Sequence, residues 1–152
     1  MQARHWFNLV LILAVAGLIA LLWVDRGDAP TAVPISALTP EKIKNIRIEY
    51  PDADPLVFMR ETQQWRITAP VSARAEASEV RSILSLAERV PNHRYTAQEM
   101  NLGELGLAPA KLTVILNEVA IKLGDINTLE NNRYAQVGNQ VFLVENPIDT
   151  VL

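Results

Sequence analysis

Residues 75–90 read AEASEVRSILSLAERV, and they set the fold class because they carry the clearest helical pattern outside the apolar opening of the chain. Their apolar side chains recur every three or four positions, which is typical of a helix that buries one face. These side chains are Val80, Ile83, Leu84, Ala87 and Val90. Glutamates in the first turns and Arg89 in the last suit the helix dipole, and Pro91 ends the pattern. The sequence therefore predicts one amphipathic helix here.

Strand patterns precede this helix. Residues 46–50 alternate apolar and polar side chains, residues 51–55 are typical of a turn, and further strands are expected at 56–60 and 65–67. Thr39 and Pro40 suit the cap and first position of a short helical turn before the first strand. The spacing predicts an antiparallel meander that ends at Pro70.

Strand patterns also follow the helix. A short strand is expected at 93–95, a helical turn at 96–102 with Thr96 as its cap, and a loop at 103–109. Four more strands are expected, the last two joined by a turn at Gly138. They cover residues 112–116, 119–123, 133–137 and 141–144. The order strands, helix, strands predicts an α+β domain with a mainly antiparallel sheet and one main helix.

The chain opens with an uncharged apolar stretch, WFNLVLILAVAGLIALLWV, at residues 6–24. About 19 residues of helix span roughly 28 Å, close to the hydrocarbon thickness of a bilayer. Tryptophans at both ends suit the two membrane interfaces. Residues 1–24 are therefore predicted to be a transmembrane anchor, carried by Trp6, Leu9, Leu13, Gly17, Ala20 and Trp23.

The flanks predict how this anchor is oriented. Arg4 and His5 precede it, whereas two aspartates surround Arg26 after it, so the N-terminus is expected in the cytoplasm. The protein would then be a single-pass membrane protein with an exported domain, which in a bacterium means the inner membrane and a periplasmic or other extracytoplasmic domain. Ala14-Val15-Ala16 also fits a signal-peptide cleavage site, although cleavage there would leave an apolar start. Residues 25–40 are rich in proline and alanine and predict a linker, which leaves residues 41–152 for the domain.

Composition excludes several classes of function. The chain has 14 basic and 17 acidic residues, a net charge of −3, and no cysteine. A nucleic-acid partner is not expected without a basic excess, and disulfides, thiol catalysis and cysteine zinc sites are excluded. Nucleotide-binding and hydrolase motifs are absent from the sequence. No catalytic, cofactor-binding or metal-binding residue is therefore predicted, and the protein is expected not to be an enzyme.

A few polar residues were candidates for chemistry. His93 lacks a nearby acidic partner in the sequence and reads as a loop or strand residue. Asp52 and Asp54 could bind a hard cation, but their flanking prolines favour a turn. Asp125 and Glu130 belong to a polar stretch that reads as a solvated connection.

Aromatic residues leave one alternative open. Trp65 follows a polar turn and could be an exposed binding anchor, although a place in the core of the first sheet is the simpler interpretation. Tyr134 and Phe142 read as sheet-packing residues.

Residues 40–145 resemble a bacterial family known as domain of unknown function 4340. The most specific part is LGLAP (105–109) followed by the strand LTVIL (112–116) and IKLGD (121–125). The other matching pieces are KNIRI (44–48), LVF (56–58), QWRI (64–67), the helix at 75–90, YAQV (134–137) and VFLV (141–144). Longer members repeat this unit, whereas this chain has it once.

The resemblance implies an N-terminal membrane helix and an association with ABC transporters of the gliding-motility type. We therefore expect a non-enzymatic accessory or scaffold protein whose exported domain binds subunits of a membrane complex, such as an ABC transporter. The first alternative is an anchored carrier or bridge for a lipid or another apolar ligand. The second is an enzyme that acts on glycans through two carboxylates.

Overall fold

The computed structural model describes residues 15, 17, 33–128 and 131–145. One compact unit begins at Val33, and the preceding residues form a separate unit. Of the six predicted anchor residues only Gly17 is described; it is helical, as is Val15, and the other five lie outside the described residues. Among the described residues, we find no helix that combines the length and the apolar character needed to cross a bilayer.

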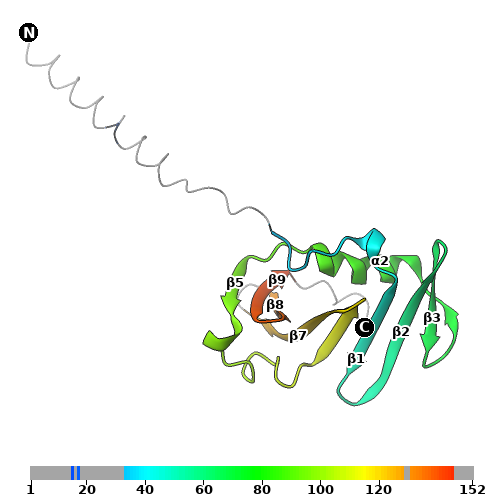
Figure 1. The fold of residues 1–152 in the computed structure, drawn as a ribbon. Helices are drawn as coiled ribbons and strands as arrows, with labels where there is room; N and C mark the ends of the chain where they lie inside the picture. The colour runs from blue at the N-terminus through cyan, green and yellow to red at the C-terminus, as the bar shows by residue number, and fades with distance from the viewer. Residues whose placement is uncertain (1–14, 16, 18–32, 129–130, 146–152) are drawn as a thin grey trace, which may run out of the picture. The chain divides into compact units, whose positions relative to one another are not determined.

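The described part of the domain is built on one open sheet of nine strands, in which every neighbouring pair is antiparallel (Figure 1). Its order is β4-β3-β2-β1-β6-β7-β8-β9-β5. The strands are β1 (Asn45–Tyr50), β2 (Ala53–Glu61), β3 (Gln64–Ala69), β4 (Ala73–Arg74), β5 (His93–Thr96), β6 (Leu112–Leu116), β7 (Val119–Asn127), β8 (Asn132–Val137) and β9 (Gln140–Glu145). The pairing of β1 with β6 joins two meanders into this single sheet.

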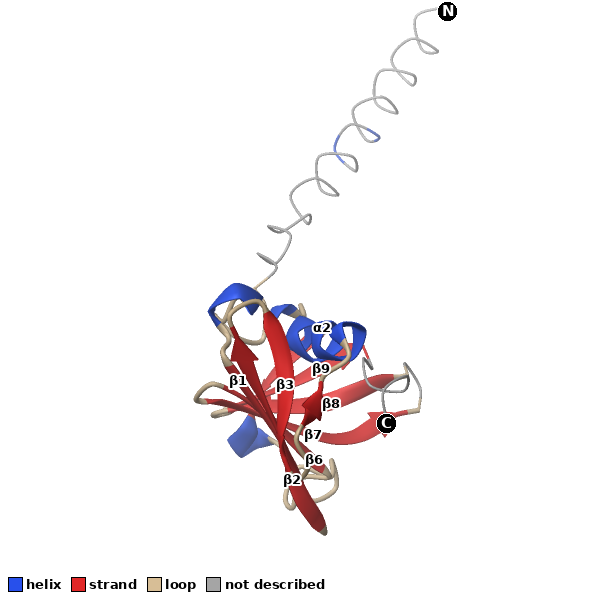
Figure 2. Ribbon diagram, turned by 90° about the vertical axis from the view of Figure 1, so that its right-hand side faces the viewer, coloured by secondary structure: helices blue, strands red, loops and turns tan. Residues whose placement is uncertain are grey.

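One helix covers one face of this curved sheet (Figure 2). It consists of α2 (Ala77–Ser85) continued by a 3-10 turn, η2 (Leu86–Glu88), so the regular helix is shorter than the predicted 75–90. Its apolar stripe buries Val80 and Ile83 in the main core cluster, together with inward side chains of β1, β2, β6, β7, β8 and β9. Two further 3-10 turns, η1 (Pro40–Lys42) and η3 (Ala97–Glu99), lie at predicted positions.

Several strand boundaries differ from the sequence prediction, and the largest extension at one end is in β7, which continues to Asn127 instead of ending at residue 123. β2 begins at Ala53, so the turn predicted over 51–55 is confined to Pro51-Asp52. Pro55 is tolerated inside β2 because the pairing with β1 is irregular at this point, where its missing N–H costs little. The first meander also continues past Pro70 into β4, which is only two residues long and has no detectable period.

The segment before β1 belongs to the domain rather than to a free linker. Ile35 is 5% exposed and lies in the main core cluster. Its backbone N–H donates to the Arg89 carbonyl over 2.9 Å, and the Ser36 hydroxyl donates to the Ala87 carbonyl over 3.0 Å. The predicted linker, residues 25–40, therefore overlaps the packed domain from Val33 onward, eight residues before the predicted domain start at Glu41.

We expect Ile35→Ala to destabilise the domain by about 2–4 kcal/mol, because it removes buried methyl groups and leaves a cavity. Denaturant unfolding of the detergent-solubilised chain measures this loss. Val33→Ala is the matched control, since Val33 is 50% exposed in the same segment and its truncation should cost at most about 0.5 kcal/mol. Equal costs for the two variants would show that the segment is not packed as described.

Candidate functional site

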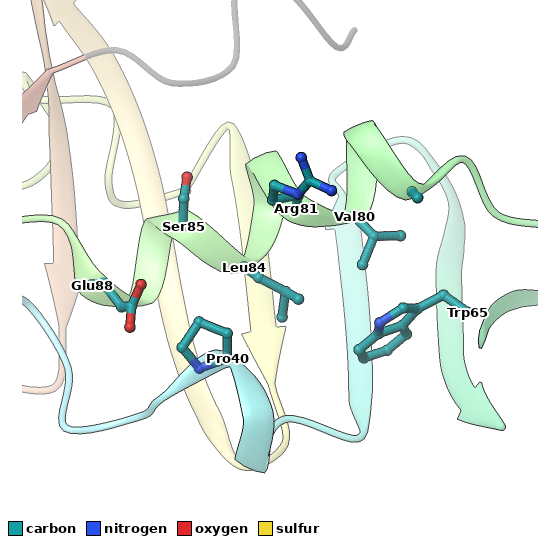
Figure 3. Close-up of a pocket in the computed structure, with 8 residues that line it drawn as sticks. Pro40, Trp65, Val80, Arg81, Leu84, Ser85 and Glu88 are labelled. Atoms are coloured by element: carbon teal, nitrogen blue, oxygen red, sulfur yellow. The ribbon is translucent and has the colours of Figure 1, made fainter. Parts of the chain in front are cut away.

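An apolar groove of about 250 Å³ runs along α2 (Figure 3). One wall is the helix, which contributes a row of side chains from α2 and η2. The opposite wall is Pro40 from η1 and Trp65 from β3. The helical row consists of Ala77, Val80, Arg81, Leu84, Ser85 and Glu88.

Trp65 is fixed at this groove by its place in the sheet. It is the second residue of β3, is paired with Arg60 of β2, and its carbonyl accepts a hydrogen bond from Ala75 N–H over 3.1 Å. The indole is half-buried and packs against the main core cluster while lining the groove. The sequence left two alternatives open for Trp65, a core residue or a binding anchor. Its position is compatible with both, because one part of the indole packs against the core while another part lines the groove.

Two opposite charges lie on the rim of the groove. Arg81 and Glu88 are exposed, and within the described part of the chain neither forms an ion pair or a side-chain hydrogen bond. Ser85 lies between them, and its hydroxyl donates to the Ser82 carbonyl over 2.7 Å. The groove therefore offers an apolar floor with one available cation and one available anion.

The acidic candidates from the sequence do not meet in one site. Asp52 is exposed in the β1–β2 turn, and Asp54 is exposed in β2. Asp125 lies in strand β7 rather than in the predicted solvated connection and is paired with Lys111, and Glu130 lies outside the described residues. Over residues 33–128 and 131–145, we find no group of three or more side chains placed to hold a metal ion.

A second hollow is lined by described residues near the end of β9. It is polar, and its lining consists of Asn92, Asn131, Asn132 and Glu145. Among the described residues, one carboxylate lines this hollow, Glu145, and one lines the groove along α2, Glu88. The described lining of neither hollow therefore includes the two carboxylates that the alternative of a glycan-acting enzyme requires.

The remaining singled-out residues have structural positions. His93 is exposed in the edge strand β5, where its ring stacks on Tyr95 with centroids 6.2 Å apart. Phe142 is 1% exposed in the main core, and Tyr134 packs against a smaller cluster around Leu107. Burial raises the pKa of the Tyr50 hydroxyl, which packs against the main core and does not line the groove.

The two most specific sequence motifs, LGLAP and LGD, meet at β7. The Asp125 N–H donates to the Leu105 carbonyl over 2.8 Å, and the Lys111 ammonium pairs with the Asp125 carboxylate. A Cβ on Gly124 would lie 2.1 Å from that same Leu105 carbonyl oxygen. The sequence singles out these motifs but does not assign them a role. Their geometry indicates that they pack the loop that contains LGLAP onto the sheet.

Comparison of the chain with protein-family models, with curated proteins and with solved structures found no match. The resemblance to domain of unknown function 4340 therefore stays a prediction that rests on residue patterns.

Proposed function

We propose that this chain is a non-enzymatic membrane-anchored accessory protein whose domain binds a partner protein of a membrane complex. The observation that carries the proposal is the apolar groove along α2, with Trp65 in one wall and two charges on its rim that have no partner among the described residues. Aromatic side chains in partly desolvated pockets, flanked by polar rims, are typical of the anchor points of protein interfaces.

The proposed membrane anchor rests on the sequence. Residues 6–24 carry no charge, and the basic residues Arg4 and His5 precede them. This arrangement favours a single-pass protein of the bacterial inner membrane with a cytoplasmic N-terminus and a periplasmic domain. The family resemblance suggests subunits of an ABC transporter as the partner class, by analogy with other members of that family.

Fractionation of cells that express the full chain with a C-terminal tag tests the anchor. We expect the chain in the membrane fraction after alkaline washing, with its domain digested by a protease added to spheroplasts. Recovery of a mature chain that starts near residue 17 in the soluble exported fraction would refute the anchor.

Extraction in mild detergent tests the partner. We expect the chain to migrate in a complex larger than its own monomer, with a membrane protein crosslinked through a photoreactive residue placed at Ser85 on the groove. The same photoreactive residue at Lys122 is the control, because Lys122 follows buried Ile121 in β7 and so lies on the sheet face away from α2. A chain that is monomeric throughout, with no crosslink specific to Ser85, would contradict the proposal.

An anchored carrier for an apolar ligand is the second candidate. It is favoured by the continuity of the sheet, since the helix that separates the strands in sequence does not separate them in space. The groove of about 250 Å³ is smaller than the roughly 300–1,000 Å³ of most ligand pockets, which favours a protein partner instead. Native mass spectrometry of the extracted chain distinguishes the two, because a carrier would retain a lipid of defined mass.

A further inference from the structure

The helical wall of the groove has the spacing of a helix-packing surface. Its residues lie at positions 77, 80, 81, 84, 85 and 88, which follow the i, i+3, i+4, i+7, i+8, i+11 pattern of one stripe of α2 and η2. Rows with this spacing form the ridges and grooves through which one helix packs against another. The stripe is distinct from core-facing positions such as Ile83 and Leu86, although Val80 and Leu84 line the groove and also pack in or against the core.

The charges on this stripe have a defined order. Arg81 and Glu88 are seven residues apart, which corresponds to about 10–12 Å along α2 and the 3-10 turn that continues it. Leu84 lies between them and is only partly buried. Because both charged groups are exposed and have no partner in residues 33–128 and 131–145, each is available to a molecule that enters the groove.

We propose that the groove binds an amphipathic helix of a partner protein that carries one acidic and one basic residue about seven positions apart. An apolar side chain between these residues would enter the space between Trp65 and Leu84. The acidic residue would pair with Arg81 and the basic residue with Glu88. This inference rests on the proposed function and adds the secondary structure and charge pattern of the partner segment.

Defined peptides test this pattern on the full chain in detergent. The probes are labelled alanine-based helices of about 15 residues, long enough to hold helical structure. Each carries a central Leu and, at the two flanking positions, Glu and Lys, two Glu, or two Lys. Fluorescence anisotropy gives the affinity of each peptide. The unaltered chain is expected to bind the Glu/Lys peptide about three- to ten-fold more tightly than either like-charged peptide, the range that two exposed ion pairs can supply.

Single charge reversals should change this preference in a predictable direction. Arg81→Glu leaves two anions on the rim, so it should favour the two-Lys peptide. Glu88→Lys leaves two cations and should favour the two-Glu peptide. Both positions are exposed, so neither substitution should unfold the domain. Lys122→Glu changes the net charge as Arg81→Glu does, but on the other sheet face, and should leave the ranking of peptides unchanged.

Three results would overturn the inference: no peptide binds, all three bind equally, or Lys122→Glu shifts the ranking as much as Arg81→Glu. A change in oligomeric state on Arg81→Glu, without peptide binding, would show that a second copy of the chain fills the groove and would also overturn it. These failures are distinct from failure of the proposed function. A membrane protein crosslinked at Ser85 on a chain that shows no peptide preference would refute this inference and leave the proposed function intact, whereas a soluble chain with the expected peptide ranking would refute the anchor alone.

Discussion

Replacing Gly124 with alanine is expected to destabilise the domain by about 3–5 kcal/mol. The new Cβ would lie 2.1 Å from the Leu105 carbonyl oxygen and 3.1 Å from the Leu107 side chain. A backbone oxygen cannot rotate away, so the loop must lift from β7. This combines the cost of overpacking with loss of the hydrogen bond from Asp125 N–H to Leu105. Denaturant unfolding in detergent measures the loss.

Two other glycines separate the steric effect from the general effect of removing a glycine. Gly103→Ala should be nearly neutral, because the nearest atom to its Cβ would be 3.5 Å away. Gly138→Ala should cost about 1 kcal/mol, since its φ of +56° is unfavourable for alanine although the space around it is open. If Gly124→Ala cost no more than Gly138→Ala, the close approach of the loop to β7 would be wrong.

Local patterns in the sequence were sufficient for most of the individual elements. The alternation of residues 112–116 predicts β6 with its observed bounds, and the apolar stripe of residues 75–90 predicts the helix that covers the sheet. These predictions succeed because each element shows its own period, two for a strand and 3.6 for a helix. The sequence did not predict that Ile35 belongs to the packed domain, because a single apolar residue in a proline-rich stretch has no period.

The arrangement of the elements was not predictable from the same patterns. The sequence does not state that β1 pairs with β6, or that β5 lies beside β9 at the far edge. Such pairings join residues that are distant in sequence, and alternation alone does not choose among the possible neighbours. The helix separates the strands in the sequence, yet the nine described strands form one continuous sheet because the helix covers a single face of it.

The candidate site was visible in the sequence only in fragments. The sequence singles out Trp65 as a candidate binding anchor, but it gives no role to Arg81 or Glu88. Their opposite charges at a seven-residue spacing place them on the same side of the helix, and this much can be recognised from the sequence. Arg81 and Glu88 lie on the rim of a groove because Pro40 and Trp65 pack beside the helix, and this packing depends on the tertiary structure.

Truncation of Phe142 to alanine is expected to cost about 3–5 kcal/mol of stability. Phe142 is 1% exposed on β9, faces Ala135 of β8 on one side and Arg94 of β5 on the other, and belongs to the main core. Its removal leaves a cavity below the helix that the surrounding strands can fill only in part. A cost below about 1 kcal/mol in denaturant unfolding would show that β9 does not form the centre of this core.

The aromatic ring of Phe142 contributes a smaller, separable interaction with β5. The Arg94 guanidinium lies 5.1 Å from the ring centroid, and its Nη2 donates to the Val33 carbonyl over 3.1 Å. Phe142→Leu keeps most of the apolar volume and should cost less than alanine. A double-mutant cycle that combines Phe142→Leu with Arg94→Met should give a coupling of about 0.5 kcal/mol, because Arg94 is exposed. A coupling of zero would limit the role of Arg94 to its hydrogen bond with Val33. Strand β5 and the segment before β1 would then be joined by that hydrogen bond alone, with no contribution from the Phe142 ring.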